Sequence, residues 1–213
     1  MTISRCYAAL KRSSAHIDAE WWPVRHDFEP PVLEIAVGAV LTQNTSWRNA
    51  ERALARMHEK KLTTARAIAH ANVRTLQSAI RPAGFYRQKA MRVKTLATFL
   101  SEKRFMNVER DELLALNGIG HETADSVLLY ALNARSFVID AYTRRVFSRL
   151  GTIDGDETYD ELKQLFERAV PKSADTYKEF HALIVEHAKA TCRAVPRCER
   201  CVLRQDCRHA HAR

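Results

Sequence analysis

The sequence predicts an all-α fold, and three observations support this expectation. Apolar residues recur at helical spacing along most of the 213 residues. All six prolines fall between these periodic segments or in the C-terminal tail, where they do not interrupt a helix. Strand signals are weak, and the best candidate, residues 136–139, is too short to form a sheet.

The expected helices cover residues 32–41, 48–57, 73–80, 88–100, 111–116, 121–132, 142–150, 159–170 and 175–191. The first is apolar, with Leu33 and Val40 on one face, and the second and fourth are amphipathic. The third is short and ends before Pro82. The fifth and sixth flank a glycine turn, and the last three follow an apolar segment that ends at Asp140.

Composition and charge limit the classes of function. The net charge is +9, and a basic protein attracts phosphate, although charge alone does not decide between nucleic acid and other partners. No apolar run reaches the roughly 20 residues of a membrane helix, and the N-terminus shows no secretory signal. We therefore expect a cytoplasmic protein, in which clustered cysteines hold metal more often than they form disulfides.

Cysteines cluster near the C-terminus with spacers of five, two and five residues, at Cys192, Cys198, Cys201 and Cys207. Thiolates at these spacings can surround one metal centre, and a [4Fe–4S] cluster is expected. Zinc is the alternative, but zinc sites usually pair two CxxC motifs and only one is present here. An unligated tail is the remaining possibility. The arginines between the cysteines either balance the charge of a cluster or face phosphate.

A glycine turn, Leu116-Asn117-Gly118-Ile119-Gly120, separates two expected helices. Glycine permits positive φ and removes the Cβ that would block a phosphate, and the N–H groups at the next helix start can then face it. The pattern predicts a helix–hairpin–helix motif over residues 111–132, a sequence-independent clamp on DNA. Ile119 would anchor the turn in the core.

Asp140 follows the apolar segment Phe137-Val138-Ile139 and precedes a helix. It can be an ordinary N-cap. It can also be a carboxylate that stabilises positive charge on deoxyribose as a base departs and that orients water. Residue type and position leave both interpretations open.

The segment Gly118-Ile119-Gly120-His121-Glu122-Thr123-Ala124, followed by Val138-Ile139-Asp140 and the cysteine loop, resembles the endonuclease III superfamily, also named HhH-GPD. The resemblance implies a base-excision DNA glycosylase in which Asp140 is catalytic. It also implies two helical domains flanking a DNA-binding cleft. We expect a six-helix block at residues 32–138, and a second domain formed by residues 1–31 with 139–213 that carries the cluster loop at 192–207.

One departure from that family concerns the reaction. Bifunctional members carry a lysine two residues after the second hairpin glycine, where this chain has Glu122. A carboxylate forms no Schiff base, so we expect a monofunctional glycosylase that uses water. Nothing in the sequence places Lys89 or Lys94 in that role. The first cysteine spacer is also one residue shorter than in the usual family pattern.

Aromatic residues near the N-terminus resemble the 3-methyladenine DNA glycosylase branch of the superfamily. The resemblance implies that Trp21, Trp22, Pro23 and Trp47, with Glu122, form a pocket for the extruded base, although tryptophans are more often core residues. A base alkylated at N3 or N7 is cationic, so aromatic faces attract it. The matching glutamine, Gln43, would fill the gap left in the duplex. Further DNA contacts are expected at Asn44, Gly118, Ile119, Gly120, His121 and Thr123.

The sequence thus predicts a monomeric, nucleoid-associated enzyme that removes alkylated purines from double-stranded DNA. Two alternatives stay open. The first is a superfamily member that acts on oxidised pyrimidines or on adenine opposite oxidised guanine. The second is a non-catalytic DNA-binding protein with a structural or redox iron–sulfur cluster.

Overall fold

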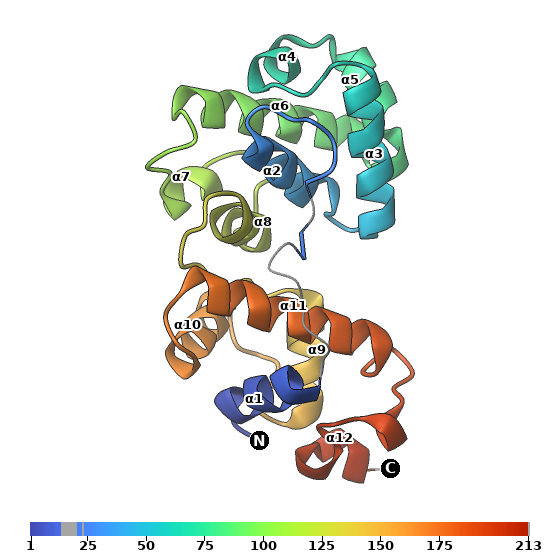
Figure 1. Ribbon diagram of the computed structural model, residues 1–213, viewed down its shortest axis with the longest axis vertical. Helices are drawn as coiled ribbons and strands as arrows, with labels where there is room; N and C mark the ends of the chain where they lie inside the picture. Colours follow the sequence, from blue (N-terminus) through green and yellow to red (C-terminus); the bar gives the residue numbers. More distant parts are fainter. Residues whose placement is uncertain (14–20, 23, 213) are drawn as a thin grey trace. The chain divides into compact units, whose positions relative to one another are not determined.

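The computed structural model describes residues 1–13, 21–22 and 24–212, so Pro23 of the expected base pocket lies outside the described residues. The described chain is helical and has no sheet, only an isolated bridge between Glu29 and Thr64. The all-α prediction is therefore confirmed (Figure 1). The strand considered at residues 136–139 does not form, because no other described segment pairs with it.

The chain divides into two compact units, a central unit, Trp22–Ala134, and a terminal unit, Met1–Trp21 with Arg135–Arg213. The helices of the central unit are α2 (Pro31–Leu41), α3 (Trp47–Glu59), α4 (Ala65–His70), α5 (Val73–Ile80), η1 (Arg81–Ala83), α6 (Tyr86–Glu102), α7 (Arg110–Leu114), α8 (His121–Ser126) and η2 (Val127–Ala131). Those of the terminal unit are α1 (Ile3–Ser13), α9 (Ala141–Leu150), α10 (Tyr159–Ala169), α11 (Ala174–Ala190), η3 (Cys198–Arg200), η4 (Arg204–Asp206) and α12 (Arg208–His211).

The unit boundaries differ from the expected ones at residues 31/32 and 138/139. The segment before α2 belongs to the central unit because the buried carboxylate of Glu34 accepts hydrogen bonds from the backbone N–H groups of Arg25 and His26. The segment before Asp140 belongs to the terminal unit because Phe137 is buried there and stacks on Phe166 at 5.0 Å between ring centroids.

The central unit is organised around α2, which packs against α3, α6, α8 and η2. The side chains of Leu33, Val37, Val40 and Leu41 have no exposed surface, so α2 is buried on most of its circumference. Each such side chain contributes about 1.5–3 kcal/mol of burial free energy. This explains why the α2 sequence is apolar apart from Glu34, whereas α3 is amphipathic.

The terminal unit brings the two ends of the chain together. Helix α11 packs against α9 and against the N-terminal helix α1, and α12 packs against α9 (Figure 1). An aromatic core holds these helices, formed by Phe137, Phe147, Phe166 and Phe180. Among the described helices, none is long and apolar enough to cross a bilayer.

Three of the described α-helices were absent from the sequence expectation: α1, α4 and the four-residue α12, which follows Cys207. Helix α1 buries Ile3, Cys6 and Leu10, a helical spacing that is readable in the sequence but surrounded by polar residues. Helix α4 has six residues, too few to show periodicity, and it starts at Thr64, whose side chain accepts a hydrogen bond from the N–H of Ala67.

Candidate functional site

Asp140 lies at the start of α9, at the end of an extended segment. One carboxylate oxygen, Oδ1, accepts a hydrogen bond of 2.7 Å from the N–H of Thr143, and the other, Oδ2, lies 3.6 Å from Nε2 of His181 on α11. The residue is 9% exposed. Asp140 is therefore an N-cap, as the simpler interpretation predicts. The cap uses one oxygen and leaves the second directed toward a histidine.

The environment of Asp140 favours its ionised form. Burial, the largest single influence, raises the pKa of the carboxyl group. The hydrogen bond and charge of His181, together with the hydrogen bonds of Thr143, outweigh burial, so the pKa lies below its ordinary value. At neutral pH Asp140 is an anion in a largely water-excluded site, the form that a stabiliser of positive charge requires.

His181 joins Asp140 to one of the expected base-pocket tryptophans. The imidazole of His181 is 4% exposed, and the Trp21 ring meets it edge to face at 5.9 Å. The Trp21 indole N–H donates a hydrogen bond of 3.1 Å to Glu186, and Lys189 lies over the ring. Sequence reasoning gave His181 no part in the site, because no local motif relates residues on α9 and α11.

The other two tryptophans meet in the central unit. The rings of Trp22 and Trp47 are 5.4 Å apart at an interplanar angle of 73°, and Tyr130 lies 4.9 Å from Trp22. A Cβ on Gly38 of α2 would lie 3.4 Å from both indoles, so glycine allows them to approach the helix closely. Tyr130 was missed because it reads as a core residue of the helix after the hairpin. Trp22 and Trp47 are thus brought together, whereas Trp21 belongs to the terminal unit.

The glycine turn has the conformation expected of a hairpin. Gly118 has φ of +83°, and a Cβ there would lie 2.2 Å from Nε of Arg92. Ile119 is buried and anchors the turn. Gly120 precedes α8 with φ of −90°, and no atom lies within 4 Å of where its Cβ would be, so the backbone can be approached closely from outside.

An ion pair holds the two helices of the hairpin together. Arg110 at the start of α7 forms two hydrogen bonds, of 2.9 and 3.1 Å, with the fully buried carboxylate of Asp125 on α8. The same guanidinium lies 3.0 Å from Nδ1 of His121, which is exposed in the first turn of α8. Glu122 beside it is also exposed, so a carboxylate occupies the position at which bifunctional family members are expected to carry lysine.

Gln43 connects the end of α2 to this hairpin. Its amide Nε2 donates to the carbonyl oxygen of Gly118 at 3.1 Å and to the hydroxyl of Thr123 at 2.9 Å, while its Oε1 accepts from Arg92 at 2.6 Å. These contacts do not test the expected insertion of Gln43 into the duplex, which stays a prediction. The next residue, Asn44, is exposed and has φ of +52°.

Phe85 is a surface residue that sequence reasoning did not select. It is 64% exposed and has φ of +44°, directly before α6. A bulky residue in the left-handed region is uncommon and costs about 1–3 kcal/mol, so such positions are concentrated at functional sites. The motif Gly84-Phe85-Tyr86 is visible in the sequence, but the exposure of the phenylalanine is not.

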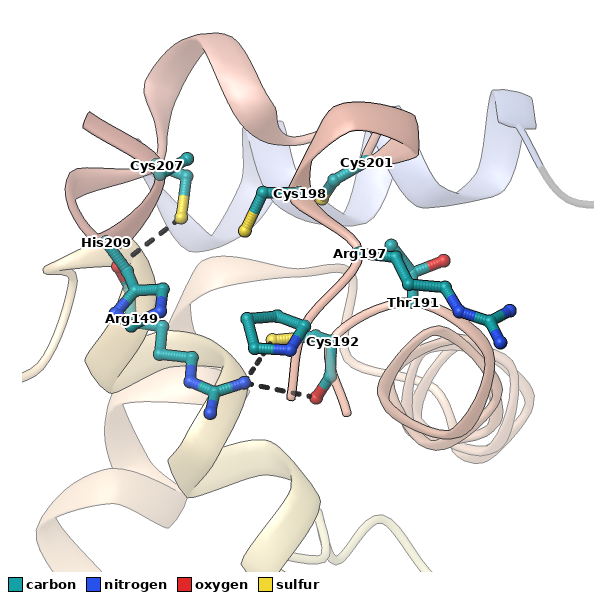
Figure 2. A pocket seen from close by; sticks show the side chains of 10 residues that line it. Arg149, Thr191, Cys192, Arg197, Cys198, Cys201, Cys207 and His209 are labelled. Atoms are coloured by element: carbon teal, nitrogen blue, oxygen red, sulfur yellow. Dashed lines mark hydrogen bonds between the residues drawn. The ribbon is translucent and has the colours of Figure 1, made fainter. Parts of the chain in front are cut away.

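The cysteines at positions 192, 198, 201 and 207 line one pocket, together with Arg149 and His209 (Figure 2). Nη1 of Arg149 lies 3.4 Å from Sγ of Cys192, and Nε2 of His187 lies 3.7 Å from Sγ of Cys201. In the described part of the chain, no three side chains of metal-binding type close around a single ion. Four thiols that share one pocket fit the donor set of a [4Fe–4S] cluster, and zinc can take the same ligands.

The electrostatics of the pocket also fit a cationic metal core. Burial raises the pKa of Cys201, and the like charges of the other three cysteines add to this effect against a hydrogen bond from Leu203. A bound metal core would reverse that balance, because thiolates are its ligands. Cys6 is different: it is fully buried in α1 as a free thiol, and burial raises its pKa to about 12, as expected for a structural cysteine.

Known proteins resemble this chain over most of its length. Residues 37–172 match the HhH-GPD superfamily of base excision DNA repair proteins. A protein of Methanocaldococcus jannaschii that is named as a DNA repair glycosylase is 46% identical over 88% of both chains. Endonuclease III of Sulfolobus acidocaldarius is 33% identical over 84% of this chain and 82% of its own.

Solved structures give the same result. The 3-methyladenine DNA glycosylase of H. pylori, bound to 1,N6-ethenoadenine, superposes with a TM-score of 0.77 at 30% identity over 89% of this chain and 98% of the other. An endonuclease III–DNA complex gives a TM-score of 0.80 at 24% identity over 100% and 98%, which establishes the fold. The chain belongs to the HhH-GPD superfamily of base excision DNA repair proteins, and within it to the DNA glycosylases.

Proposed function

We propose that this chain is a monofunctional DNA glycosylase that hydrolyses the N-glycosidic bond of alkylated purines. The observation that carries this proposal is the ionised, nearly buried carboxylate of Asp140, with one oxygen held by Thr143 and the other beside His181. The likeness to a 3-methyladenine DNA glycosylase supports the choice of substrate.

Asp140 would act on the sugar. As the base departs, positive charge develops on deoxyribose, and a fixed carboxylate in a water-excluded site stabilises that charge and orients the attacking water. His181 would keep Oδ2 in place through the contact at 3.6 Å. Glu122 supplies no amine for a Schiff base, which supports hydrolysis without strand cleavage.

The aromatic residues would select the substrate. An alkylated purine is cationic and is already a good leaving group, so it needs no strong acid to protonate it. Aromatic faces attract such a cation by about 0.5–2 kcal/mol, and base stacking adds about 1–3 kcal/mol. We assign this role to Trp22 and Trp47 with Tyr130, and extend it to Trp21 and Pro23 as the sequence predicts.

The DNA would be held by the hairpin and by two exposed side chains. Open space around Gly120 supports close approach of a phosphate to its backbone. Asn44 and Phe85 are exposed in left-handed conformations on two loops of the same unit. Apolar side chains such as Phe85 can enter a base step and unstack it, which lowers the cost of extruding a nucleotide.

The cysteine pocket would hold a [4Fe–4S] cluster through Cys192, Cys198, Cys201 and Cys207. When bound, the cluster would cross-link the C-terminal loop, and its positive metal core would oppose the burial and the mutual repulsion that raise the pKa of Cys201. Arg149 supports this loop from α9, because its guanidinium donates to the carbonyl oxygens of Arg193 at 2.5 Å and Ala194 at 3.0 Å.

A second candidate substrate is an oxidised pyrimidine, and the 33% identity to an endonuclease III supports it. A panel of duplexes with single lesions separates the two candidates. Release of 3-methyladenine, with strand breaks only after alkali, supports the proposal. Release of oxidised pyrimidines with breaks before alkali would replace it. No release from any lesion, alongside tight binding to abasic DNA, would favour a non-catalytic DNA-binding protein.

A further inference from the structure

Helix α6 carries a buried lysine whose ammonium, within the described part of the chain, binds carbonyl groups and no carboxylate. The side chain of Lys89 is 1% exposed, and its ammonium donates to the carbonyl oxygens of Leu41 at 2.9 Å and Ala83 at 2.8 Å. Burial, and then the positive charge of Arg92, lower its pKa to about 8. A buried charge costs free energy, so its presence in the core calls for a role that an apolar residue would not fill.

The two carbonyl groups belong to the segments that lead to the exposed residues described above. Leu41 is the last residue of α2, three positions before Asn44. Ala83 ends η1, two positions before Phe85. The carbonyl of Phe85 in turn accepts the backbone N–H of Lys89 at 3.0 Å. One ammonium therefore ties together two loops that are distant in the sequence.

The same face of α6 also reaches the hairpin. Arg92, one helical turn after Lys89, holds Oε1 of Gln43, and the amide of Gln43 holds the carbonyl of Gly118. Three loops of the central unit are thus connected through two side chains of one helix and the glutamine between them. A substitution of Lys89 would first alter the loops of Asn44 and Phe85, because its ammonium binds a carbonyl group at the start of each loop.

We propose that Lys89 is a positioning residue for DNA binding, which fixes the loops of Asn44 and Phe85 in one arrangement so that both side chains enter the duplex together. The inference rests on the proposed function, because it assumes that these loops contact DNA. An apolar residue of similar volume could fill the space of the Lys89 side chain, but it would leave the carbonyl groups of Leu41 and Ala83 without this donor.

Lys94 provides a matched control on the same helix. Its ammonium also donates to a backbone carbonyl, that of Ala71 at 2.5 Å, which lies between α4 and α5. The Lys94→Met variant removes a bond of the same kind from a loop that the proposal does not involve. Lys94 is half-buried and loses one such bond, whereas Lys89 is fully buried and loses two, so the stability of both variants is measured alongside their binding.

The experiment measures binding to a duplex that contains a tetrahydrofuran abasic analogue, relative to undamaged duplex. We expect Lys89→Met to lower this preference by about tenfold or more, a loss comparable to one stacked base, and Lys94→Met to leave it within about twofold. Equal effects of the two variants would overturn the inference. If the wild-type chain itself shows no preference for the abasic duplex, the proposed function fails instead.

A double-mutant cycle with Phe85→Ala separates positioning from general stability. If Lys89 acts through the Phe85 loop, the loss in Lys89→Met and Phe85→Ala combined is smaller than the product of the two single losses. Independent effects would contradict the proposal. Circular dichroism and thermal unfolding establish that each variant is folded. If Lys89→Met does not fold, Lys89→Gln takes its place in the cycle, and failure of both to fold would show a purely structural role.

Discussion

Replacement of Asp140 by asparagine separates the two roles that the structure gives this residue. Asparagine is as good an N-cap as aspartate, and its side-chain oxygen can still accept the hydrogen bond from the N–H of Thr143. The variant loses only the negative charge, which faces His181 and favours the helix N-terminus. We therefore expect the free energy of unfolding to fall by about 0.5–1 kcal/mol.

The expected effect on catalysis is much larger. Two unit charges about 4 Å apart attract each other by about 4 kcal/mol at an effective dielectric constant of about 20. Because about 1.4 kcal/mol corresponds to a factor of ten in rate, loss of the carboxylate charge opposite the developing sugar cation should slow base release by roughly a thousandfold. The single-turnover rate of 3-methyladenine release from methylated duplex DNA measures this directly.

Thr158→Ala is the matched control. Thr158 caps α10 in the same way, accepting from the N–H of Glu161, but it has no contact with Asp140 in the described structure. This variant should lose about 1 kcal/mol of stability and keep the rate of base release. An Asp140→Asn protein that binds DNA normally and retains more than about a tenth of the wild-type rate would refute the catalytic assignment.

The lowered pKa of Asp140 predicts how the stability difference between wild type and Asp140→Asn depends on pH. Its folded-state pKa is lowered below the ordinary value of 3.8, so its charge contributes stability that is fully present above that value. The contribution is lost as the pH falls through the folded pKa. The difference in unfolding free energy between wild type and Asp140→Asn should therefore be present at about pH 5 and shrink in stronger acid. A difference that grew in acid would contradict the assigned ionisation.

Four further variants test the rest of the site. Gly118→Ala should lose about 1–3 kcal/mol of stability in thermal unfolding, because φ is +83° and the new Cβ would overlap Arg92. Gly120→Ala should fold normally and lose affinity for duplex DNA. Equal stability of the two variants would contradict the hairpin geometry. Cys198→Ser should abolish the brown absorbance of an iron–sulfur cluster and lower the iron content per chain. An iron content that the substitution leaves unchanged, or zinc bound in place of iron, would refute the cluster. Glu122→Lys should allow borohydride to trap a covalent DNA adduct that the wild-type chain does not form, and trapping by wild type would refute monofunctional hydrolysis.

Much of the fold could be predicted because the signals are local. Helical periodicity, prolines between segments and capping residues such as Thr158 act within a few residues of the chain, so the all-α class and most helix positions follow from the sequence. The short α4 and the polar α1 were missed, since packing against α6 and α11 stabilises them more than their own sequences do. The central unit begins at Trp22, before the expected boundary at residue 32, because the Glu34 carboxylate binds a preceding segment that carries no helical pattern.

The residues of the candidate site also divide into those that the sequence indicates and those that only the packed structure brings together. The sequence by itself indicated which residues could do chemistry: the cysteine loop and the hairpin glycines through the spacing of short motifs, and Asp140 and the tryptophans through the resemblance to a family. Tertiary structure alone decided that His181 faces Asp140, that Tyr130 joins Trp22, and that Lys89 binds two carbonyl groups. These contacts connect different helices, and their free energy depends on burial and distance, which are properties of the packed chain and leave no local pattern.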